Sequence, residues 1–272
     1  MSTDFFFTKE NLDHCLRELG KEFRKRGGKQ APAEIILIGG AAVLVGYGFR
    51  DMTYDVDAVI QAASSIKDAI NTVGDALGLP NGWLNSDFMR TKSYSPKLLQ
   101  HSVYYKTFSG VLTVRTVSGE YLVAMKLMSG RQYKNDISDI IGILREQKEA
   151  GKPLSMSDID RAVCDLYGGW DNMPEEAREL AESILRSDNL EKLYQQYRSE
   201  EKSNKEALIQ FEKDYPNVVT EDNLKDIIRE LKARKKDDRE RLPLLTTQYA
   251  SCRWDSNLIG FFYCRKPKGR MM

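Results

Sequence analysis

The sequence EIILIGGAAVLVGYGFRDMTYDVDAVIQ occupies residues 34–61 and decides the fold of the chain. Four apolar residues, 35–38, lead directly into Gly39 and Gly40, which is typical of a buried strand that ends in a tight turn. A short helix is expected over residues 41–45, because they are small or apolar and two further glycines follow them. The stretch therefore predicts a strand, a glycine turn and a short helix in succession.

Two aspartates, Asp55 and Asp57, follow in a second strand-like run that ends at Ile60. Because side chains of a strand alternate between its faces, both carboxylates point one way and Val56 points the other. They would lie roughly 6 to 7 Å apart, so they could share or bridge the divalent cations that stabilise oxygens in phosphoryl transfer. The simpler alternative is a pair of solvated aspartates on an ordinary edge strand.

The double glycine supplies the other half of a phosphate site. A backbone without Cβ atoms at a helix N-terminus lets a triphosphate approach free N–H groups and the positive end of the helix dipole. Arg50 and Thr53 stand just before the aspartates and would add a fork of donors and a hydroxyl group. We therefore expect Gly39, Gly40, Arg50 and Thr53 to bind a nucleotide.

This ordered combination resembles the nucleotidyltransferase superfamily, which shares the palm-like fold of DNA polymerase β. The resemblance implies an α/β (α+β) nucleotidyltransferase fold, with a small mixed sheet flanked by helices. It also implies an NTP substrate, with Mg²⁺ or Mn²⁺ held by Asp55 and Asp57. One departure stands out, because many relatives carry a third metal-binding carboxylate on a later strand and residues 112–117, LTVRTV, contain none. A degenerate module that binds a nucleotide or a partner without turnover therefore stays an alternative.

Two charges lie on the apolar side of a helical stretch that starts at Ser118 or Gly119 and runs to Leu144. Lys126 follows two apolar residues at helical spacing, and Asp136 precedes two isoleucines in the same way. An unpaired buried charge is expensive, so both side chains need partners. Triphosphate and metal would serve, and so would an ion pair between Lys126 and either Asp136 or Asp139.

The charged residues that follow the first turn of this stretch include Lys126, Arg131, Lys134, Asp136 and Asp139. Their arrangement is similar to the later motifs of the AbiEii-type branch of the superfamily, which includes toxins of toxin–antitoxin and abortive-infection systems. By that resemblance Lys126 binds phosphate, and Asp136 binds metal or acts as a base. The resemblance covers roughly residues 31–145 and fades after them.

Composition excludes several classes of protein. The chain has 272 residues, a net charge of +1 and only two histidines, which argues against catalysis by a histidine base and against histidine-rich metal sites. Its four cysteines are scattered without a CxxC motif, so we expect reduced thiols in a cytoplasmic protein. No apolar run approaches the roughly 20 residues that span a bilayer, and no secretory signal is recognised, so no membrane partner is expected.

The length favours two domains. We expect a nucleotidyltransferase core with an N-terminal helix over residues 1–150, and a mostly helical domain over 151–272, where apolar residues recur at spacings of three and four. The last segment, 249–270, interleaves aromatic and basic residues, a composition that suits RNA contact. A strand packed on the body is the alternative for this segment.

Two other stretches leave alternatives open. Residues 21–29 carry five basic residues around one glutamate. They would complement the dipole of a helix C-terminus or contact a polyanionic substrate. Residues 83–101 are irregular, and a long loop is often functional. Trp83 or Phe88 could stack on a base there, or could anchor the loop.

The function expected from the sequence is the transfer of a nucleoside monophosphate from an NTP to an acceptor hydroxyl. The AbiEii-like resemblance favours RNA, including tRNA, as acceptor, in a toxin or phage-defence enzyme that would have a cognate antitoxin protein as partner. The same superfamily also modifies small molecules such as antibiotics, which makes a small-molecule transferase the next choice among enzymes.

Overall fold

The computed structural model describes residues 5–131, 134–220, 223–224 and 226–233. The chain divides into two compact units, Met1–Pro216 and Asn217–Met272. The domain boundary predicted at residue 150 falls inside the first unit, and it stays a prediction. The aromatic and basic segment predicted to contact RNA lies outside the described residues.

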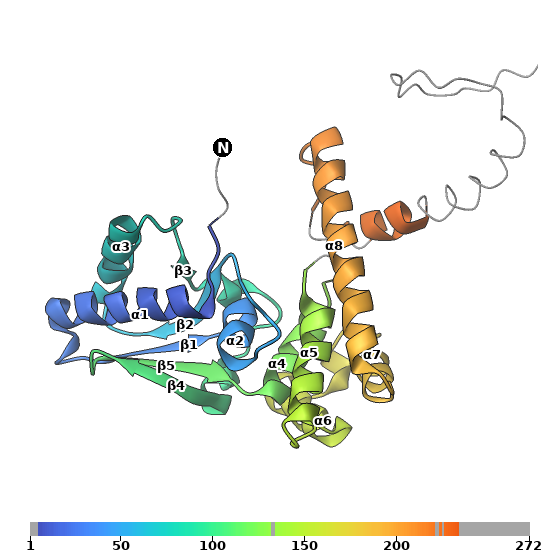
Figure 1. The fold of residues 1–272 in the computed structure, drawn as a ribbon, viewed down its shortest axis with the longest axis horizontal. Coiled ribbons are helices and arrows are strands. Elements are labelled where there is room, and N and C mark those ends of the chain that lie inside the picture. Colours follow the sequence, from blue (N-terminus) through green and yellow to red (C-terminus); the bar gives the residue numbers. More distant parts are fainter. Residues whose placement is uncertain (1–4, 132–133, 221–222, 225, 234–272) are drawn as a thin grey trace, which may run out of the picture. The chain divides into compact units, whose positions relative to one another are not determined.

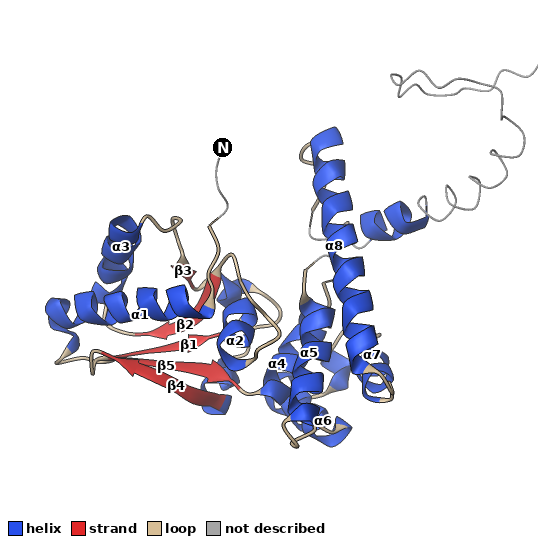
Figure 2. Ribbon diagram, viewed as in Figure 1, coloured by secondary structure: helices blue, strands red, loops and turns tan. Residues whose placement is uncertain are grey.

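The first unit contains a five-stranded mixed sheet with the strand order β3-β2-β1-β5-β4 (Figure 2). The central strand β1 pairs antiparallel with β2 and parallel with β5. Helices flank the sheet and continue through the C-terminal part of the unit, so the expected fold class is confirmed. The strands are β1 Ala33–Leu37, β2 Val56–Gln61, β3 Leu84–Asn85, β4 Ser102–Phe108 and β5 Leu112–Val117.

Helices occupy both faces of the sheet and form the rest of the unit (Figure 1). Helices α1 and α3 cover one face, whereas α4 to α8 gather at the end of the sheet where β1 leads into α2. The α-helices are α1 Lys9–Phe23, α2 Gly39–Gly46, α3 Ser65–Leu77, α4 Gly119–Ser129, α5 Asp136–Glu149, α6 Met156–Tyr167, α7 Ala177–Leu185 and α8 Leu190–Asp214.

Local sequence explains where α1 begins and how it packs. The Thr8 backbone N–H donates to Asn11 Oδ1 at 2.8 Å, and the Asn11 N–H donates to Thr8 Oγ1 at 3.3 Å, which forms a capping box. The buried side of α1 then packs with alternate residues of β1 and with α3. This packing fixes which face of the sheet turns away from α1, and Asp57 belongs to that other face with Val59.

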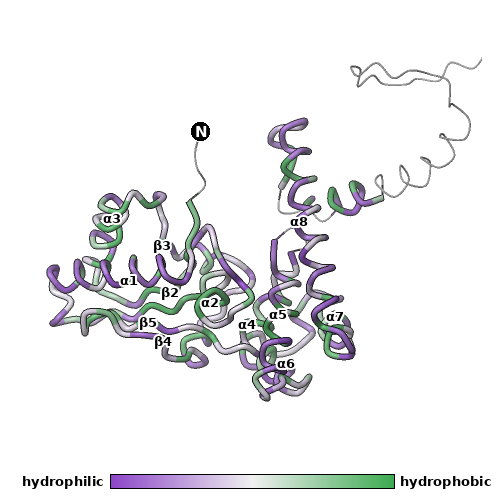
Figure 3. Tube along the Cα trace, viewed as in Figure 1, coloured by the Kyte–Doolittle hydropathy of each residue, from purple (hydrophilic) through white to green (hydrophobic). Residues whose placement is uncertain are grey.

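Helix α2 is apolar over its whole length, and residues 41–45 are all buried. Figure 3 shows the same hydrophobic character in β1 and α2. A helix that is apolar all round must be surrounded by protein, and here α2 contacts β2, β5 and α4. The glycine turn at its start is therefore held in the middle of the unit.

The helical stretch predicted from residue 118 to Leu144 is broken in the structure. Helix α4 ends at Ser129, and Gly130 follows with a left-handed φ of 54°, a conformation that favours glycine at a helix end. A new helix, α5, starts at Asp136. The break matters because it brings the start of α5 back toward the end of α4.

The loop of residues 83–101 is anchored to the body. Trp83 is only 3% exposed and its Nε1 donates to the Ile70 carbonyl oxygen at 3.1 Å, so this ring is a core residue. Phe88 packs edge-on against Tyr94. Further along the loop, Ser95 Oγ donates to the carbonyl oxygen of Leu166 in α6 at 2.8 Å. The anchoring alternative describes this loop, and Trp83 is not available to stack on a base.

Within the described residues, none of the helices combines the length and the apolar character that a bilayer crossing requires.

The close packing of α1 on the sheet gives a prediction about Gly20. A Cβ atom at Gly20 would lie 2.9 Å from the Cβ of Phe108, so we expect Gly20→Ala to lower the free energy of unfolding by about 1 to 3 kcal/mol through overpacking. Gly46→Ala is the control, because no atom lies within 4 Å of the added Cβ; it should be neutral or stabilising by up to about 1 kcal/mol. Urea unfolding measures both, and equal effects would contradict the packing argument.

Candidate active site

The turn between β1 and α2 lies directly beside one of the predicted carboxylates. Gly39 has a left-handed φ of 56°, and a Cβ atom there would lie 3.7 Å from Asp57 Oδ2. The Ile38 N–H donates to the Asp57 carbonyl oxygen at 3.0 Å, which ties β2 to the end of β1. The structure therefore brings the glycine turn and Asp57 together.

Asp55 lies just before β2 and is exposed, whereas Asp57 is half-buried. Burial raises the pKa of Asp57, and the negative charge of Asp55 raises it further, while Lys134 and Arg131 oppose the rise. Thr53 Oγ1 donates to Asp55 Oδ1 at 3.4 Å. The two carboxylates are thus electrostatic neighbours, and together they concentrate negative charge beside the turn.

Gly40 is packed against the other two residues predicted to bind a nucleotide. A Cβ atom at Gly40 would lie 2.5 Å from Thr53 Oγ1 and 2.9 Å from Arg50 Nη2, distances that no ordinary side chain tolerates. Thr53 is buried, and its backbone exchanges two hydrogen bonds with Phe7 at 2.7 and 2.9 Å. The absence of a side chain at Gly40 is therefore what lets Arg50 and Thr53 reach the turn.

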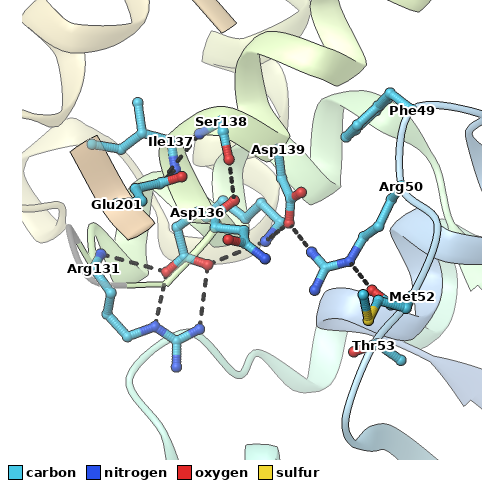
Figure 4. Close-up of polar contacts among 12 residues, drawn as sticks. Phe49, Arg50, Met52, Thr53, Arg131, Asp136, Ile137, Ser138, Asp139 and Glu201 are labelled. Atoms are coloured by element: carbon cyan, nitrogen blue, oxygen red, sulfur yellow. Dashed lines mark hydrogen bonds and ion pairs between the residues drawn. The ribbon is translucent and has the colours of Figure 1, made fainter. Parts of the chain in front are cut away.

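A buried network of ion pairs extends from Arg50 (Figure 4). Arg50 Nη1 pairs with Asp139 Oδ2, and Lys126 Nζ lies 2.7 Å from the same oxygen. Lys126 Nζ also lies 3.1 Å from Asp136 Oδ1, whose second oxygen accepts from Arg131 Nε at 2.8 Å. Arg50 and Arg131 thus end a chain of alternating charges. The structure thus shows the ion-pair alternative for Lys126, with both Asp136 and Asp139 as partners.

These contacts hold Lys126 and Asp136 in fixed charge states. Burial lowers the pKa of Lys126, but Asp139 and Asp136 outweigh that effect and the net pKa is raised. Burial raises the pKa of Asp136, but Lys126 and Arg131 outweigh it and hold the pKa well below its usual range. A carboxylate held so strongly ionised is a poor proton acceptor. The geometry therefore favours a positioning role for both residues, and their direct catalytic roles stay predictions.

The segment before Arg50 is fastened to α5 and α8. The Gly48 N–H donates to both carboxylate oxygens of Glu146 at 3.0 Å. The Phe49 ring lies so close to Gly142 that an added Cβ would be 2.6 Å from it, and the ring also packs edge-on against Tyr194 at 5.7 Å. Helix α5 thus positions the loop that carries Arg50.

Glu201, a residue of α8, caps the start of α5. Asn135 makes no side-chain cap on this helix. Glu201 Oε1 instead accepts from the N–H groups of Ile137 at 2.8 Å and Ser138 at 3.3 Å, which are donors that a helix N-terminus leaves unpaired. Burial raises the pKa of Glu201 to about 7, and these hydrogen bonds oppose the rise. Helix α8 therefore supports the ion-pair network through the helix that carries Asp136 and Asp139.

Sequence reasoning gave Asp139 no role at the site beyond that of a possible partner for Lys126. The structure places it at the centre of the network, 1% exposed and shared by two cations. Its spacing was a usable signal, because Asp139 lies three residues after Asp136 and therefore on the same side of the helix. Glu146 and Glu201 gave no such signal, because their partners are backbone groups distant in sequence.

Strand β5, on which many members of the superfamily carry a third carboxylate, carries the cation Arg115 here. Arg115 of β5 pairs with Ile36 of β1, and its Nε lies 3.4 Å from Glu34 Oε1. Within the described residues there is no cluster of three or more His, Cys, Asp or Glu side chains arranged to hold a metal ion. Among the described residues beside the glycine turn, the carboxylate pair Asp55 and Asp57 is the donor set.

That pair fits a divalent cation on chemical grounds, because carboxylate oxygens are the ligands that Mg²⁺ and Mn²⁺ prefer. The mutual repulsion of Asp55 and Asp57, which contributes to the raised pKa of Asp57, would be relieved by a bound cation. Such an ion would supply charge neutralisation at a phosphate. The residues of the chain would hold it beside the Gly39 turn.

The fold and this constellation agree with a comparison to known families. Residues 14–147 match a family model described as nucleotidyltransferase of unknown function (DUF6036). The match covers just under half of the chain, and it includes the glycine turn, Asp55, Asp57 and the ion-pair network. Use of an NTP is implied by this nucleotidyltransferase family. The description does not mention the AbiEii-type branch, and no curated protein and no solved structure matches the chain.

The central position of Asp139 gives a prediction about stability. Asp139→Asn keeps the size of the side chain but leaves Arg50 without its carboxylate and weakens the pairing of buried Lys126. We expect the free energy of unfolding to fall by about 3 to 5 kcal/mol. The control is Glu182→Gln, which breaks exposed pairs with Arg178 and Arg186 and should cost less than about 1 kcal/mol. Similar losses for both variants in urea unfolding would show that the network is not stabilising.

The raised pKa of Glu201 gives a prediction about pH. Because the folded state favours the protonated carboxyl, the free energy of unfolding should fall by up to about 3 kcal/mol as pH rises from 4.5 to about 7. Glu201→Gln should remove this part of the fall. The free energy of unfolding of the variant, relative to that of the natural protein, should therefore rise across that pH range. Glu206→Gln, on an exposed part of α8, is the control. Parallel curves for the natural protein and Glu201→Gln would contradict the prediction.

Proposed function

We propose that this protein transfers a nucleoside monophosphate from an NTP to an acceptor hydroxyl in a reaction that depends on Mg²⁺ or Mn²⁺. The observation that supports it best is the carboxylate of Asp57 against the bare backbone of Gly39, with Asp55 as its electrostatic neighbour. Carboxylates beside a glycine turn at a helix N-terminus suit a metal-bound triphosphate. The match of residues 14–147 to a nucleotidyltransferase family supports the same reaction class.

The bonds change as follows in the proposed reaction. The acceptor oxygen forms a bond to the α-phosphorus, the bond from that phosphorus to the bridging oxygen breaks, and pyrophosphate leaves with the bonding electrons. The hydroxyl proton passes to solvent. Such transfers depend on positioning and charge neutralisation more than on covalent catalysis.

Each group of the site has a proposed task. Asp55 and Asp57 hold the cation and orient the acceptor hydroxyl. The backbone N–H groups of Gly39 and Gly40 donate hydrogen bonds to phosphate oxygens. Arg50 lies against Gly40 and adds positive charge there, and Thr53 supplies a hydroxyl group. Lys126 and Asp136 act through Asp139 and Arg131 by fixing this arrangement, although the AbiEii-like resemblance gives Lys126 a phosphate contact and Asp136 a metal or base role.

RNA, including tRNA, is the proposed acceptor, and a toxin or phage-defence role with a cognate antitoxin is the proposed setting. Both proposals rest on the likeness of the segment from Lys126 to Asp139 to the AbiEii-type branch. A small molecule such as an antibiotic is an alternative acceptor of the same chemistry.

A second candidate function is nucleotide binding without turnover. It is supported by the cation Arg115 on the strand where relatives carry a carboxylate, and by the engagement of Lys126 and Asp136 in ion pairs. This candidate predicts a stabilising effect of NTP with Mg²⁺, but no transferred label.

The deciding experiment incubates the protein with each α-labelled NTP, Mg²⁺, and either total RNA or cell extract. We expect label on RNA, and we expect Asp57→Asn to reduce the rate about 100-fold or more, because it weakens the hold on the cation that neutralises developing charge. Asp68→Asn is the control, since Asp68 is an exposed acid of α3.

The other outcomes are distinguishable. A gain in thermal stability with NTP and Mg²⁺ that Asp57→Asn abolishes, without any labelled product, would favour the binding module. Label on a small molecule would replace RNA as the acceptor. No thermal shift and no product would overturn the proposed function.

A further inference from the structure

Helix α8 carries cations beside the candidate active site to which the proposed reaction gives no task. The match to the nucleotidyltransferase family covers residues 14–147, so α8 lies outside the matched part of the chain. Its contacts with the loop that leads into Asp55 nevertheless bring it to the site. The residues of α8 that form this side, which we name the loop-facing side, are Tyr194, Arg198, Glu201 and Lys205.

The four residues of the loop-facing side follow one another at spacings of four, three and four residues. Helical residues that are three and four apart lie next to each other on one side of the helix. Glu201, in the middle of this side, accepts from the Ile137 N–H at the start of α5 at 2.8 Å (Figure 4). The loop-facing side is therefore turned toward the part of the molecule that holds the ion-pair network.

The loop before Asp55 runs along the same side of α8. At one end, the Tyr194 hydroxyl donates to the Phe49 carbonyl oxygen at 3.4 Å, and the two rings pack edge-on at 5.7 Å. At the other end, Lys205 Nζ lies 5.2 Å from the centre of the Tyr54 ring. Eleven helical steps cover roughly 16 Å, and five extended steps of a loop cover about the same distance. Helix α8 thus accompanies the loop as far as the residue directly before Asp55.

Most cations at the site are already paired with carboxylates. The ion-pair network sets its three cations against two buried carboxylates. Lys134 is different, because it has no ion pair among the described residues, and its charge opposes the rise that burial causes in the pKa of Asp57. A triphosphate keeps negative charge even after it binds one divalent cation, so further cations without carboxylate partners would stabilise it.

Arg198 and Lys205 are cations of this kind. Neither side chain has a hydrogen bond or an ion pair with any residue that the structure describes. Burial raises the pKa of the Tyr194 hydroxyl, and the charge of Arg198 opposes that rise, so the guanidinium lies near the group that contacts the loop. Lys205 contacts the face of Tyr54, a ring that is 52% exposed. Such a contact is weak where water surrounds it, so a phosphate competes with it easily.

We propose that Arg198 and Lys205 bind the phosphates of the NTP, so that α8 forms one wall of the nucleotide site. The inference rests on the proposed function and adds to it two binding residues from outside the part of the chain that matches the family. Seven helical steps separate their Cα atoms by roughly 10 Å, and both side chains are long enough to converge on neighbouring phosphates. Tyr54 is a positioning residue that keeps Lys205 beside Asp55. Because the contacts are to phosphates, this wall does not distinguish one base from another.

Calorimetric titration of the full chain with ATP, GTP, CTP and UTP in turn, each with Mg²⁺, tests the proposal. We expect Lys205→Gln and Arg198→Gln each to raise Kd about 5-fold or more, because each removes a charge-assisted contact to a phosphate oxygen. The factor should be the same for every NTP that binds. The matched control is Lys192→Gln, which removes the same charge from an exposed lysine on the opposite side of α8.

Variants of Tyr54 test how Lys205 is held. Tyr54→Phe keeps the ring and should leave Kd unchanged, whereas Tyr54→Leu removes the cation–π contact and should raise Kd about 2-fold. In a protein that already carries Lys205→Gln, the change Tyr54→Leu should have no further effect, because the two residues act through one contact. An undiminished effect of Tyr54→Leu in that double variant would show that Tyr54 does not act through Lys205.

Two results would overturn the binding role of α8. One is a Kd that changes no more in Lys205→Gln and Arg198→Gln than in Lys192→Gln. The other is a rise in Kd for one NTP alone, which would indicate contact with a base. Lys205→Arg, which keeps the charge, should hold Kd within about 2-fold of the natural value. Urea unfolding with equal midpoints shows that the variants keep the fold.

The same titrations separate this proposal from the proposed function. A natural protein that binds none of the four NTPs with Mg²⁺ refutes the nucleotidyltransferase site and the wall together. A natural protein whose binding is weakened by Asp57→Asn but not by the two α8 variants refutes only the wall. Weakening by Asp57→Asn and by both α8 variants supports the two proposals at once.

Discussion

The carboxylate of Asp139, buried between Lys126 and Arg50, is the interaction on which the candidate site depends. It joins α4, α5 and the loop that leads into β2, three segments that are separate in sequence. The three cations and two carboxylates of this network are stable only as a complete set, since removal of one member leaves a buried partner uncompensated. Arg50 therefore reaches the glycine turn because α5 presents an anion to it. The site is a joint product of the sheet and the helices.

The glycine turn shows why backbone space matters as much as charge. Side chains of Thr53 and Arg50 occupy the volume where a Cβ of Gly40 would stand, and the Asp57 carboxylate lies beside Gly39. A larger residue at Gly40 would push Thr53 and Arg50 away from the helix N-terminus, and a larger residue at Gly39 would strain a left-handed backbone. The same elbow that ends a buried strand thus decides which side chains can gather around a phosphate.

The sequence allowed the strand, turn and helix around Gly39 to be predicted, because apolar runs and glycines are local signals. The mixed sheet and its flanking helices follow the predicted fold class. The break at Gly130 was harder to see, since the apolar spacing continues on both sides of it. Contacts such as Glu201 with the start of α5 and Glu146 with Gly48 join distant residues through backbone donors. No pattern in a single sequence reports such pairs. Asp139 is an intermediate case. Its helical spacing from Asp136 could be recognised in the sequence, but its ion pair with Arg50 could not.

The fastening of the Arg50 loop to α5 limits how the protein could be divided. A shortened chain that stopped after β5 would retain the five strands, the elbow and both aspartates. It would also lack Asp139, Glu146 and Gly142, which hold Arg50, Gly48 and Phe49 in place. The smallest autonomous piece with an ordered elbow thus extends well beyond the sheet, so the helices after β5 cannot be treated as a detachable accessory.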